Sequence, residues 1–141
     1  PTKTMVKNKS IILIDDSIVR GTTCHKIVKM LYEAGAAEVH VRIACPQIKF
    51  PDFYGVDMPT KEELLAHNRC ISEMTKYIKA KSLKFLSLDG LYKALIGEKR
   101  NIVYPQFSDH YFTGDYPVKP SDNLEGLKVK QLSLLSGKSN S

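Results

Sequence analysis

The stretch that decides the fold is Ile11-Ile-Leu-Ile-Asp-Asp-Ser-Ile-Val-Arg-Gly-Thr-Thr23. Its first four residues form a continuous, largely β-branched apolar run, which predicts a central strand of a parallel sheet, buried on both faces. The run stops at Asp15 and Asp16, and a helix is expected from about Thr22. A strand that leads through a short polar loop into a helix is typical of α/β folds, whose ligands bind beyond the carboxyl ends of the strands.

The following residues continue the alternation of helix and strand. Gly35 is suited to end the first helix, and alternating apolar residues predict a second strand over 39–43. Strand, helix and strand form one crossover unit, which is expected to be right-handed. A loop with three prolines and Gly55 covers 46–60. The apolar face of the first helix is predicted to consist of Cys24, Ile27, Val28, Leu31 and Ala34.

Shorter elements are expected from Thr60 to Arg100. Thr60 and Glu63 have the spacing of a capping box at the start of a short helix. A further helix, a strand over 83–86 and a last helix capped by Ser87 follow. The apolar residues that support these elements are Leu64 and Leu65, then Ile71, Met74 and Ile78, and finally Leu88, Leu91, Leu95 and Ile96.

The pattern weakens after Arg100, where proline and glycine pairs interrupt any long element. Residues 129–135 are expected to form one short strand or helical turn, and residues 137–141 a frayed tail. We therefore predict an α/β unit over 1–100 and a partly irregular C-terminal extension over 101–141. The chain opens with Pro1 rather than Met, so we expect it to be a piece of a longer protein.

Composition excludes several classes of protein. The 141 residues are 43% hydrophobic and 26% charged, which is the balance of a globular domain, and no apolar run is long enough to span a membrane. The net charge of +6 is spread along the chain between acidic residues, so we expect no nucleic-acid binding but an attraction for small anions. The cysteines Cys24, Cys45 and Cys70 form no CxxC pair and are expected to be buried, reduced thiols.

The loop after the first strand has the chemistry of a phosphate site. The start of a helix offers backbone N–H groups and a partial positive charge, and Gly21 lets the backbone approach an anion closely. Hydroxyl groups from Ser17, Thr22 and Thr23 add donors. The other known phosphate motifs, GxxxxGK[ST] and GxGxxG, do not occur.

The two carboxylates need a different partner, because they would repel a phosphate. A ribose diol donates hydrogen bonds to carboxylates, and a Mg²⁺ ion that bridges diol and pyrophosphate oxygens also prefers oxygen ligands. The alternative is that Asp16 or Ser17 only caps a helix. On the first reading, Mg²⁺ binds at Asp15 and Asp16. The residues that bind phosphate and ribose are then Asp15, Asp16, Ser17, Ile18, Val19, Arg20, Gly21, Thr22 and Thr23.

These residues resemble the signature of type I phosphoribosyltransferases, and within that group the glutamine phosphoribosylpyrophosphate amidotransferase family. The resemblance covers about residues 10–118. It continues, in order, through the blocks at 33–44, 53–60, 62–66, 82–91, 112–114 and 116–117. It implies a type I phosphoribosyltransferase-like parallel sheet with flanking helices, of which residues 1–100 are the C-terminal part.

The resemblance also implies a function. Family enzymes are transferases of the cytoplasm that make 5-phosphoribosylamine from phosphoribosyl pyrophosphate and ammonia, in the first step of purine nucleotide synthesis. The ammonia comes from glutamine in a separate glutaminase domain, and the intact chains form homo-oligomers that also bind purine nucleotides. The glutaminase domain is missing here, so we expect no catalytic residue in this fragment and no activity from it alone.

Departures from the family narrow these expectations. Some members bind an iron–sulfur cluster through cysteines near 53–55 and 112–114, whereas this chain has Asp52 and a Cys-free stretch over 107–111, so no cluster is expected. Two other functions stay open. One is a base-salvage phosphoribosyltransferase, which shares the acidic pair. The other is a non-catalytic regulator that senses phosphoribosyl ligands. Arg20 either contacts the phosphate or faces solvent.

Overall fold

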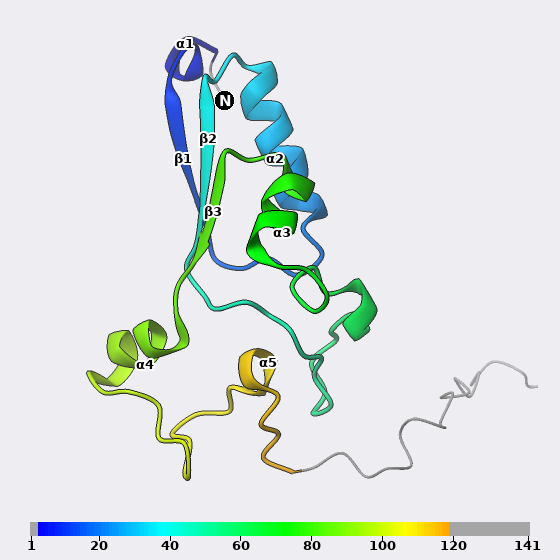
Figure 1. Cartoon of the computed structure of the whole chain (residues 1–141), viewed down its shortest axis with the longest axis vertical. Helices are drawn as coiled ribbons and strands as arrows, with labels where there is room; N and C mark the ends of the chain where they lie inside the picture. Colours follow the sequence, from blue (N-terminus) through cyan, green and yellow to red (C-terminus); the bar gives the residue numbers. More distant parts are fainter. Residues whose placement is uncertain (1–2, 119–141) are drawn as a thin grey trace, which may run out of the picture.

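Three parallel strands form the centre of the fold, in the order β1 (Ser10–Asp15), β2 (Glu38–Ile43) and β3 (Ser82–Phe85) (Figure 1). The structure is a computed structural model that describes residues 3–118. Leu13 of β1 lies opposite Val41 of β2, which lies opposite Leu83 of β3. The α/β fold class predicted from the sequence is confirmed.

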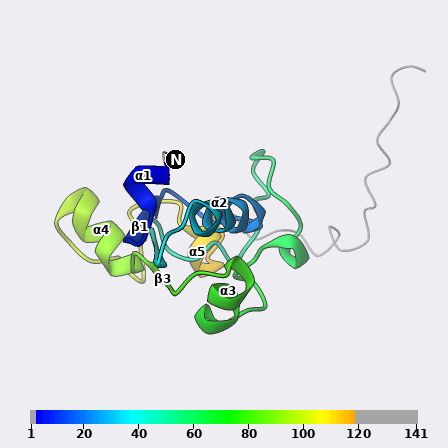
Figure 2. The same ribbon diagram turned by 90° about the horizontal axis from the view of Figure 1, so that it is seen from above.

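Two helices connect the strands and cover one face of the sheet. Helix α2 (Thr22–Glu33) packs against β2, and α3 (Ile71–Ile78) packs against β3 and α2. Both lie on the same side of the sheet (Figures 1 and 2). This is expected for successive crossovers of one hand between strands in sequential order. The core lies between these layers, with Val28, Val39, Val41, Met74 and Ile78 among its fully buried side chains.

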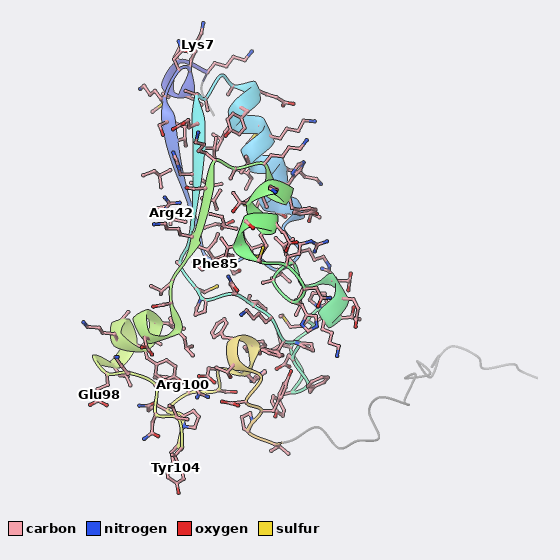
Figure 3. All side chains as sticks on the ribbon, viewed as in Figure 1. Lys7, Arg42, Phe85, Glu98, Arg100 and Tyr104 are labelled. Atoms are coloured by element: carbon pink, nitrogen blue, oxygen red, sulfur yellow. The ribbon has the colours of Figure 1, made fainter. Side chains whose placement is uncertain are left out.

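The opposite face of the sheet is open among residues 3–118. Ile12 and Ile14 of β1 are 64% and 73% exposed, and Arg42 of β2 extends on the same side (Figure 3). The prediction of a central strand buried on both faces is therefore wrong for this chain, because β1 lies at an edge and the central strand is β2. A continuous apolar run shows that both faces are suited to burial, but helices of the described part of the chain cover only one.

The helix caps that the sequence predicts are present. Gly35 follows α2 with φ 94°, the capping box of Thr60 and Glu63 starts the 3₁₀-helix η1 (Lys61–Glu63), and Ser87 accepts a hydrogen bond from the Gly90 N–H at the start of α4 (Leu88–Ile96). The short helices α1 (Lys3–Val6) and α5 (His110–Thr113) carry no such pattern and were not predicted. The elements predicted for 129–135 and 137–141 lie outside the described residues.

Helices α4 and α5 lie beyond the carboxyl ends of the strands (Figure 1). The predicted apolar face of α4 is wrong in its second half: Leu88 and Leu91 are half-buried, but Leu95 and Ile96 are 60% and 40% exposed, and the fully buried residue is Tyr92. The Tyr92 hydroxyl donates to Asp109, which is also paired with the buried guanidinium of Arg100. A long-range polar contact, and not the helix periodicity, therefore selects the side of α4 that is buried.

A second polar network fixes the 46–60 loop against α5. Asp52 Oδ1 lies 2.8 Å from His110 Nε2 and accepts a hydrogen bond from the Tyr111 hydroxyl, and Asp52 Oδ2 accepts from the backbone of Tyr54 and Val56. Burial alone would raise the pKa of Asp52, but these hydrogen bonds lower it to about 2. Asp52 is therefore a structural anchor in the described part of the chain.

Two further expectations need correction. Cys70 is exposed and Cys45 is only half-buried, so of the three thiols only Cys24 is buried as predicted. Ile71, assigned to the apolar face of α3, is 44% exposed because it lies in the first turn, away from the sheet-facing Met74 and Ile78. Within residues 3–118, no helix has the length and apolar character needed to cross a bilayer.

The open sheet face predicts a difference between two isoleucines that occupy adjacent strands. Ile43→Ala removes a side chain that is 4% exposed in the core and should cost about 2–5 kcal/mol of unfolding free energy. Ile14→Ala truncates an exposed side chain and should cost less than about 1 kcal/mol. Urea unfolding of the 141-residue chain at two protein concentrations measures both. Equal costs would show that the Ile14 face is covered in solution.

Candidate functional site

A hollow of about 330 Å³ lies at the carboxyl end of β1, where the chain passes into α2. It is lined by residues 15–24, so the structure brings together all nine residues that the sequence assigns to phosphate and ribose, and adds Cys24. The site forms here because β1 is paired in the sheet and α2 packs on the sheet, and the six residues from Asp16 to Gly21 must connect them.

The acidic side of the hollow comes from the end of the strand. The Asp15 carbonyl accepts a hydrogen bond from the Ala44 N–H, which ties the end of β1 to β2. Asp15 Oδ1 accepts from the Asp16 N–H at 3.0 Å, and Asp16 Oδ1 accepts from the Ser17 hydroxyl at 2.9 Å. Asp15 is half-buried and Asp16 is exposed. Neither carboxylate is enclosed in the core, so both retain oxygen lone pairs for a ligand.

The loop itself is anchored at its middle. Ile18 is 4% exposed and belongs to the hydrophobic core, so only its backbone is available to a ligand. The next carbonyl, that of Val19, accepts a hydrogen bond of 2.8 Å from the Leu65 N–H. These two contacts hold the loop in one shape before any ligand binds, which limits the entropy lost on binding.

Gly21 ends the loop in a conformation that few other residues adopt. Its φ of 77° is left-handed, and a Cβ at this position would lie 2.6 Å from Leu65 Cδ2 and 3.1 Å from Tyr77 Cε1. Gly21 is also the N-cap of α2, where no side chain caps the helix. The N–H groups of the first turn are therefore left for an anion, and the exposed Thr22 and Thr23 add hydroxyls beside them.

Charged groups around the loop favour an anion at this end. Arg20 lines the hollow, and its Nε donates to Glu63 Oε1 at 3.2 Å. The Arg20 side chain is therefore held beside the site by an ion pair. His25, one turn into α2, has Nδ1 2.9 Å from the Tyr77 carbonyl. Arg69 lies over the Tyr77 ring at 5.5 Å. The helix end and Arg20 therefore favour an anion, while the carboxylates lie at the strand end.

Cys24 is the one thiol among the residues that line the hollow. Burial, followed by the nearby Asp15 carboxylate, raises the pKa of its thiol to about 11. The thiol therefore stays protonated at neutral pH, and its thiolate is too scarce for nucleophilic catalysis. The arrangement as a whole is suited to binding and orienting an anionic sugar rather than to covalent catalysis.

A metal at this site would need ligands in addition to the described side chains. No cluster of three or more His, Cys, Asp or Glu side chains with metal-binding geometry occurs in the part of the chain that the structure describes. Two carboxylates that share an ion with phosphate oxygens are nevertheless the usual arrangement for Mg²⁺. Asp15 and Asp16 are the two side chains of the hollow that could hold such an ion.

Sequence reasoning missed the residues that support the loop from below. Leu65 and Tyr77 are 44 and 56 residues from Gly21 in the numbering. Tyr77 lies near Gly21 because α3 packs beside α2, and Leu65 because its N–H donates to the Val19 carbonyl. The capping box predicted Glu63 as a helix cap, but its second contact with Arg20 has no signal in the sequence. An exposed glutamate three residues after a threonine is too common to indicate such a contact.

Comparison with known proteins shows what this chain is similar to. It is 53% identical over 135 residues to an amidophosphoribosyltransferase of Rhizobium etli, covering 95% of this chain and 27% of the relative. It is 45% identical to a chloroplastic amidophosphoribosyltransferase of Arabidopsis thaliana, covering 93% and 22%. The chain thus spans about a quarter of the length of the curated relatives it matches. No family model matches it.

Two solved structures of related enzymes superpose on this chain. The glutamine phosphoribosylpyrophosphate amidotransferase of B. subtilis, complexed with ADP and GMP, superposes with a TM-score of 0.75 and 45% identity, covering 85% of this chain and 26% of that one. A structure described as the allosteric regulatory enzyme of purine biosynthesis superposes with a TM-score of 0.70 and 41% identity, with the same coverage. The type I phosphoribosyltransferase-like fold expected from the sequence is confirmed.

The space under the loop predicts that Gly21 tolerates no side chain. Gly21→Ala should cost about 2–4 kcal/mol of unfolding free energy, because left-handed strain adds to the contact with Leu65. Gly97→Ala is the matched control, since Gly97 has φ 75° but a methyl group there would meet no atom within 4 Å, and it should cost about 1–2 kcal/mol. Urea unfolding compares them, and equal losses would contradict the close packing under the loop.

The three thiols should differ in reactivity. At pH 8, a disulfide reagent should modify the exposed Cys70 first, because burial and nearby carboxylates raise the pKa of both Cys24 and Cys45 to about 11. Cys70→Ser should abolish the fast phase without changing the slow ones. Two or more fast thiols in the wild-type chain would show that the end of β1 is not packed as described.

Proposed function

We propose that this chain, which is homologous to about a quarter of the length of the amidophosphoribosyltransferases, supplies the phosphoribosyl-binding part of such an enzyme. The intact protein would make 5-phosphoribosylamine from phosphoribosyl pyrophosphate and ammonia taken from glutamine, the first step of purine nucleotide synthesis. The observation that carries this proposal is one hollow with carboxylates at the strand end and open N–H groups at the helix end. Those two ends match the diol and the phosphate of one sugar.

The substrate would lie along the loop. Its 5-phosphate would accept hydrogen bonds from the first-turn N–H groups of α2 and from the hydroxyls of Thr22 and Thr23, where the helix dipole favours an anion. The ribose hydroxyls would donate to Asp15 and Asp16, whose carboxylates are held by Asp16 N–H and Ser17 Oγ. A hollow of about 330 Å³ lies within the usual size range of small-ligand sites.

The reaction is a substitution at the anomeric carbon. Ammonia forms a new C–N bond, the bond to the pyrophosphate oxygen breaks, pyrophosphate leaves with the electron pair, and the ammonium product loses a proton. No residue of the chain acts as nucleophile in this scheme. Asp15 and Asp16 hold the ribose so that the anomeric carbon is presented to ammonia, and this orientation is the contribution of the chain. When bound, Mg²⁺ would neutralise charge on the leaving pyrophosphate.

Several features support the view that more protein surrounds this part. Sheets of parallel strands are normally covered on both faces, whereas Ile12 and Ile14 are exposed here and β1 pairs only with β2 within residues 3–118. We propose that the remainder of the intact protein covers this face, provides the glutaminase domain, binds purine nucleotides and forms a homo-oligomer in the cytoplasm. The isolated chain should then bind ligands but show no glutamine-dependent turnover.

The other two functions considered are not favoured. A base-salvage phosphoribosyltransferase and a non-catalytic regulator would both retain the acidic pair, but the relatives that match most of this chain are named amidophosphoribosyltransferases. The absence of an iron–sulfur cluster remains a prediction. The carboxylate of Asp52, at the position discussed for such a cluster, is engaged by His110 and Tyr111.

Titration calorimetry with ribose 5-phosphate and with inorganic phosphate, each with Mg²⁺, tests the proposal. Wild type should prefer ribose 5-phosphate, and Asp15→Asn with Asp16→Asn should lower its affinity about tenfold while leaving that for phosphate unchanged or higher, since the acids serve the sugar. Asp89→Asn with Asp115→Asn is the charge-matched control, because neither residue lines the hollow. The proposal would be contradicted if the Asp15→Asn, Asp16→Asn variant also lost its affinity for inorganic phosphate, or if the wild-type chain showed no saturable binding.

A further inference from the structure

The segment from Glu63 to Leu65 lies beside the phosphate loop and makes two hydrogen bonds with it. The Leu65 N–H donates to the Val19 carbonyl at 2.8 Å, and the Glu63 carboxylate accepts from Arg20 Nε at 3.2 Å. Between them, these contacts hold the loop immediately before Gly21. No residue of this segment lines the hollow, so it can act on a ligand only through the loop or through the long-range repulsion of its carboxylate.

Glu63 uses its two oxygens for different partners. Oε2 accepts from the Thr60 N–H in the capping box, and Oε1 accepts from Arg20 Nε. The hydrogen bond from Thr60 therefore orients the carboxylate independently of Arg20. The hydrogen bond with Arg20 is also the largest cause that lowers the pKa of Glu63, so the carboxylate is ionised at neutral pH.

The ion pair with Glu63 leaves the two terminal nitrogens of the Arg20 guanidinium available to a ligand. Its Nε is the one guanidinium nitrogen with a protein partner in the part of the chain that the structure describes, and the side chain is 52% exposed at the hollow. A guanidinium can donate to an anion through its two terminal nitrogens while Nε is bound elsewhere. An anchor at Nε therefore fixes the arginine and keeps its anion-binding edge unoccupied.

We propose that Glu63 is a positioning residue for the phosphate site, which holds Arg20 by Nε so that its terminal nitrogens face the anion bound at the loop. This inference rests on the proposed function, since it needs a phosphate at Ser17–Thr23. Of the two alternatives for Arg20, contact with the phosphate or exposure to solvent, it favours contact with the phosphate. Glu63 itself never touches the ligand.

Whether removal of the Glu63 carboxylate weakens or strengthens anion binding distinguishes a positioning role from simple electrostatic repulsion. Removing a carboxylate near an anion site should by itself strengthen anion binding, because a repulsion is lost. If Glu63 orients Arg20, its removal should weaken binding instead. Glu62 is the matched control, because it is the neighbouring glutamate of η1, it is exposed, and no contact joins it to Arg20 among the described residues.

The experiment measures the dissociation constant of inorganic phosphate for the 141-residue chain at low salt, with thermal unfolding of each variant recorded in parallel. Glu63→Ala should weaken binding about three- to tenfold, whereas Glu62→Ala should leave it unchanged or slightly stronger. Arg20→Ala should weaken it at least as much as Glu63→Ala. Adding Glu63→Ala to Arg20→Ala should cause no further loss, because the effect passes through the arginine.

Three controls complete the test. Thr60→Ala removes the reciprocal half of the capping box but keeps Glu63, and should leave phosphate affinity within about twofold. Glu63→Gln replaces Glu63→Ala if the latter lowers the unfolding temperature, and Glu63→Asp should restore part of the affinity. This inference alone would be overturned if Glu63→Ala and Glu62→Ala changed the phosphate affinity equally. It would also be overturned if Glu63→Ala lowered that affinity further in the Arg20→Ala background. Absence of saturable phosphate binding by wild type would overturn the proposed function with it.

Discussion

The constraint on which the site depends is the backbone at Gly21, which must pass from strand to helix in a left-handed conformation directly above Leu65 and Tyr77. The end of β1 is fixed by its register with β2, and the start of α2 is fixed by packing on the sheet. The loop between them has one buried anchor, Ile18, and no space for another side chain at Gly21. The hollow exists because these fixed ends leave the first N–H groups of α2 and the carboxylates of β1 facing one region.

This arrangement separates two kinds of polar group along one loop. The carboxylates at the strand end repel anions and accept from hydroxyls, whereas the helix end and Arg20 attract anions. A phosphorylated sugar satisfies both, because its two ends differ in the same way. The similarity to amidophosphoribosyltransferases over nearly the whole chain gives this physical match a chemical context, and the quarter-length coverage explains why binding, rather than turnover, is expected of this part.

Local signals predicted which residues come together in the hollow, but they predicted the packing less well. The strand, the acidic pair and Gly21-Thr22-Thr23 were found because each residue type has a strong local reason to occur there, and the caps at Thr60 and Ser87 for the same reason. Periodicity could not show which apolar side of α4 is buried, because the Tyr92–Asp109 hydrogen bond decides it. The exposed Ile12 and Ile14 show a similar limit, since an apolar face indicates suitability for burial but not what covers it. The Arg20–Glu63 pair, 43 residues apart, follows only from the fold.

The most direct test of the central claim is an NMR titration of the ¹⁵N-labelled chain with ribose 5-phosphate, followed through the backbone amides. If the loop holds the sugar at both ends, saturable shifts should appear together at the amides of Gly21–Cys24 and at those of Asp16 and Ser17, while amides of α4 and α5 stay unchanged. A response confined to other parts of the chain, or one at the helix end without the strand end, would contradict the account.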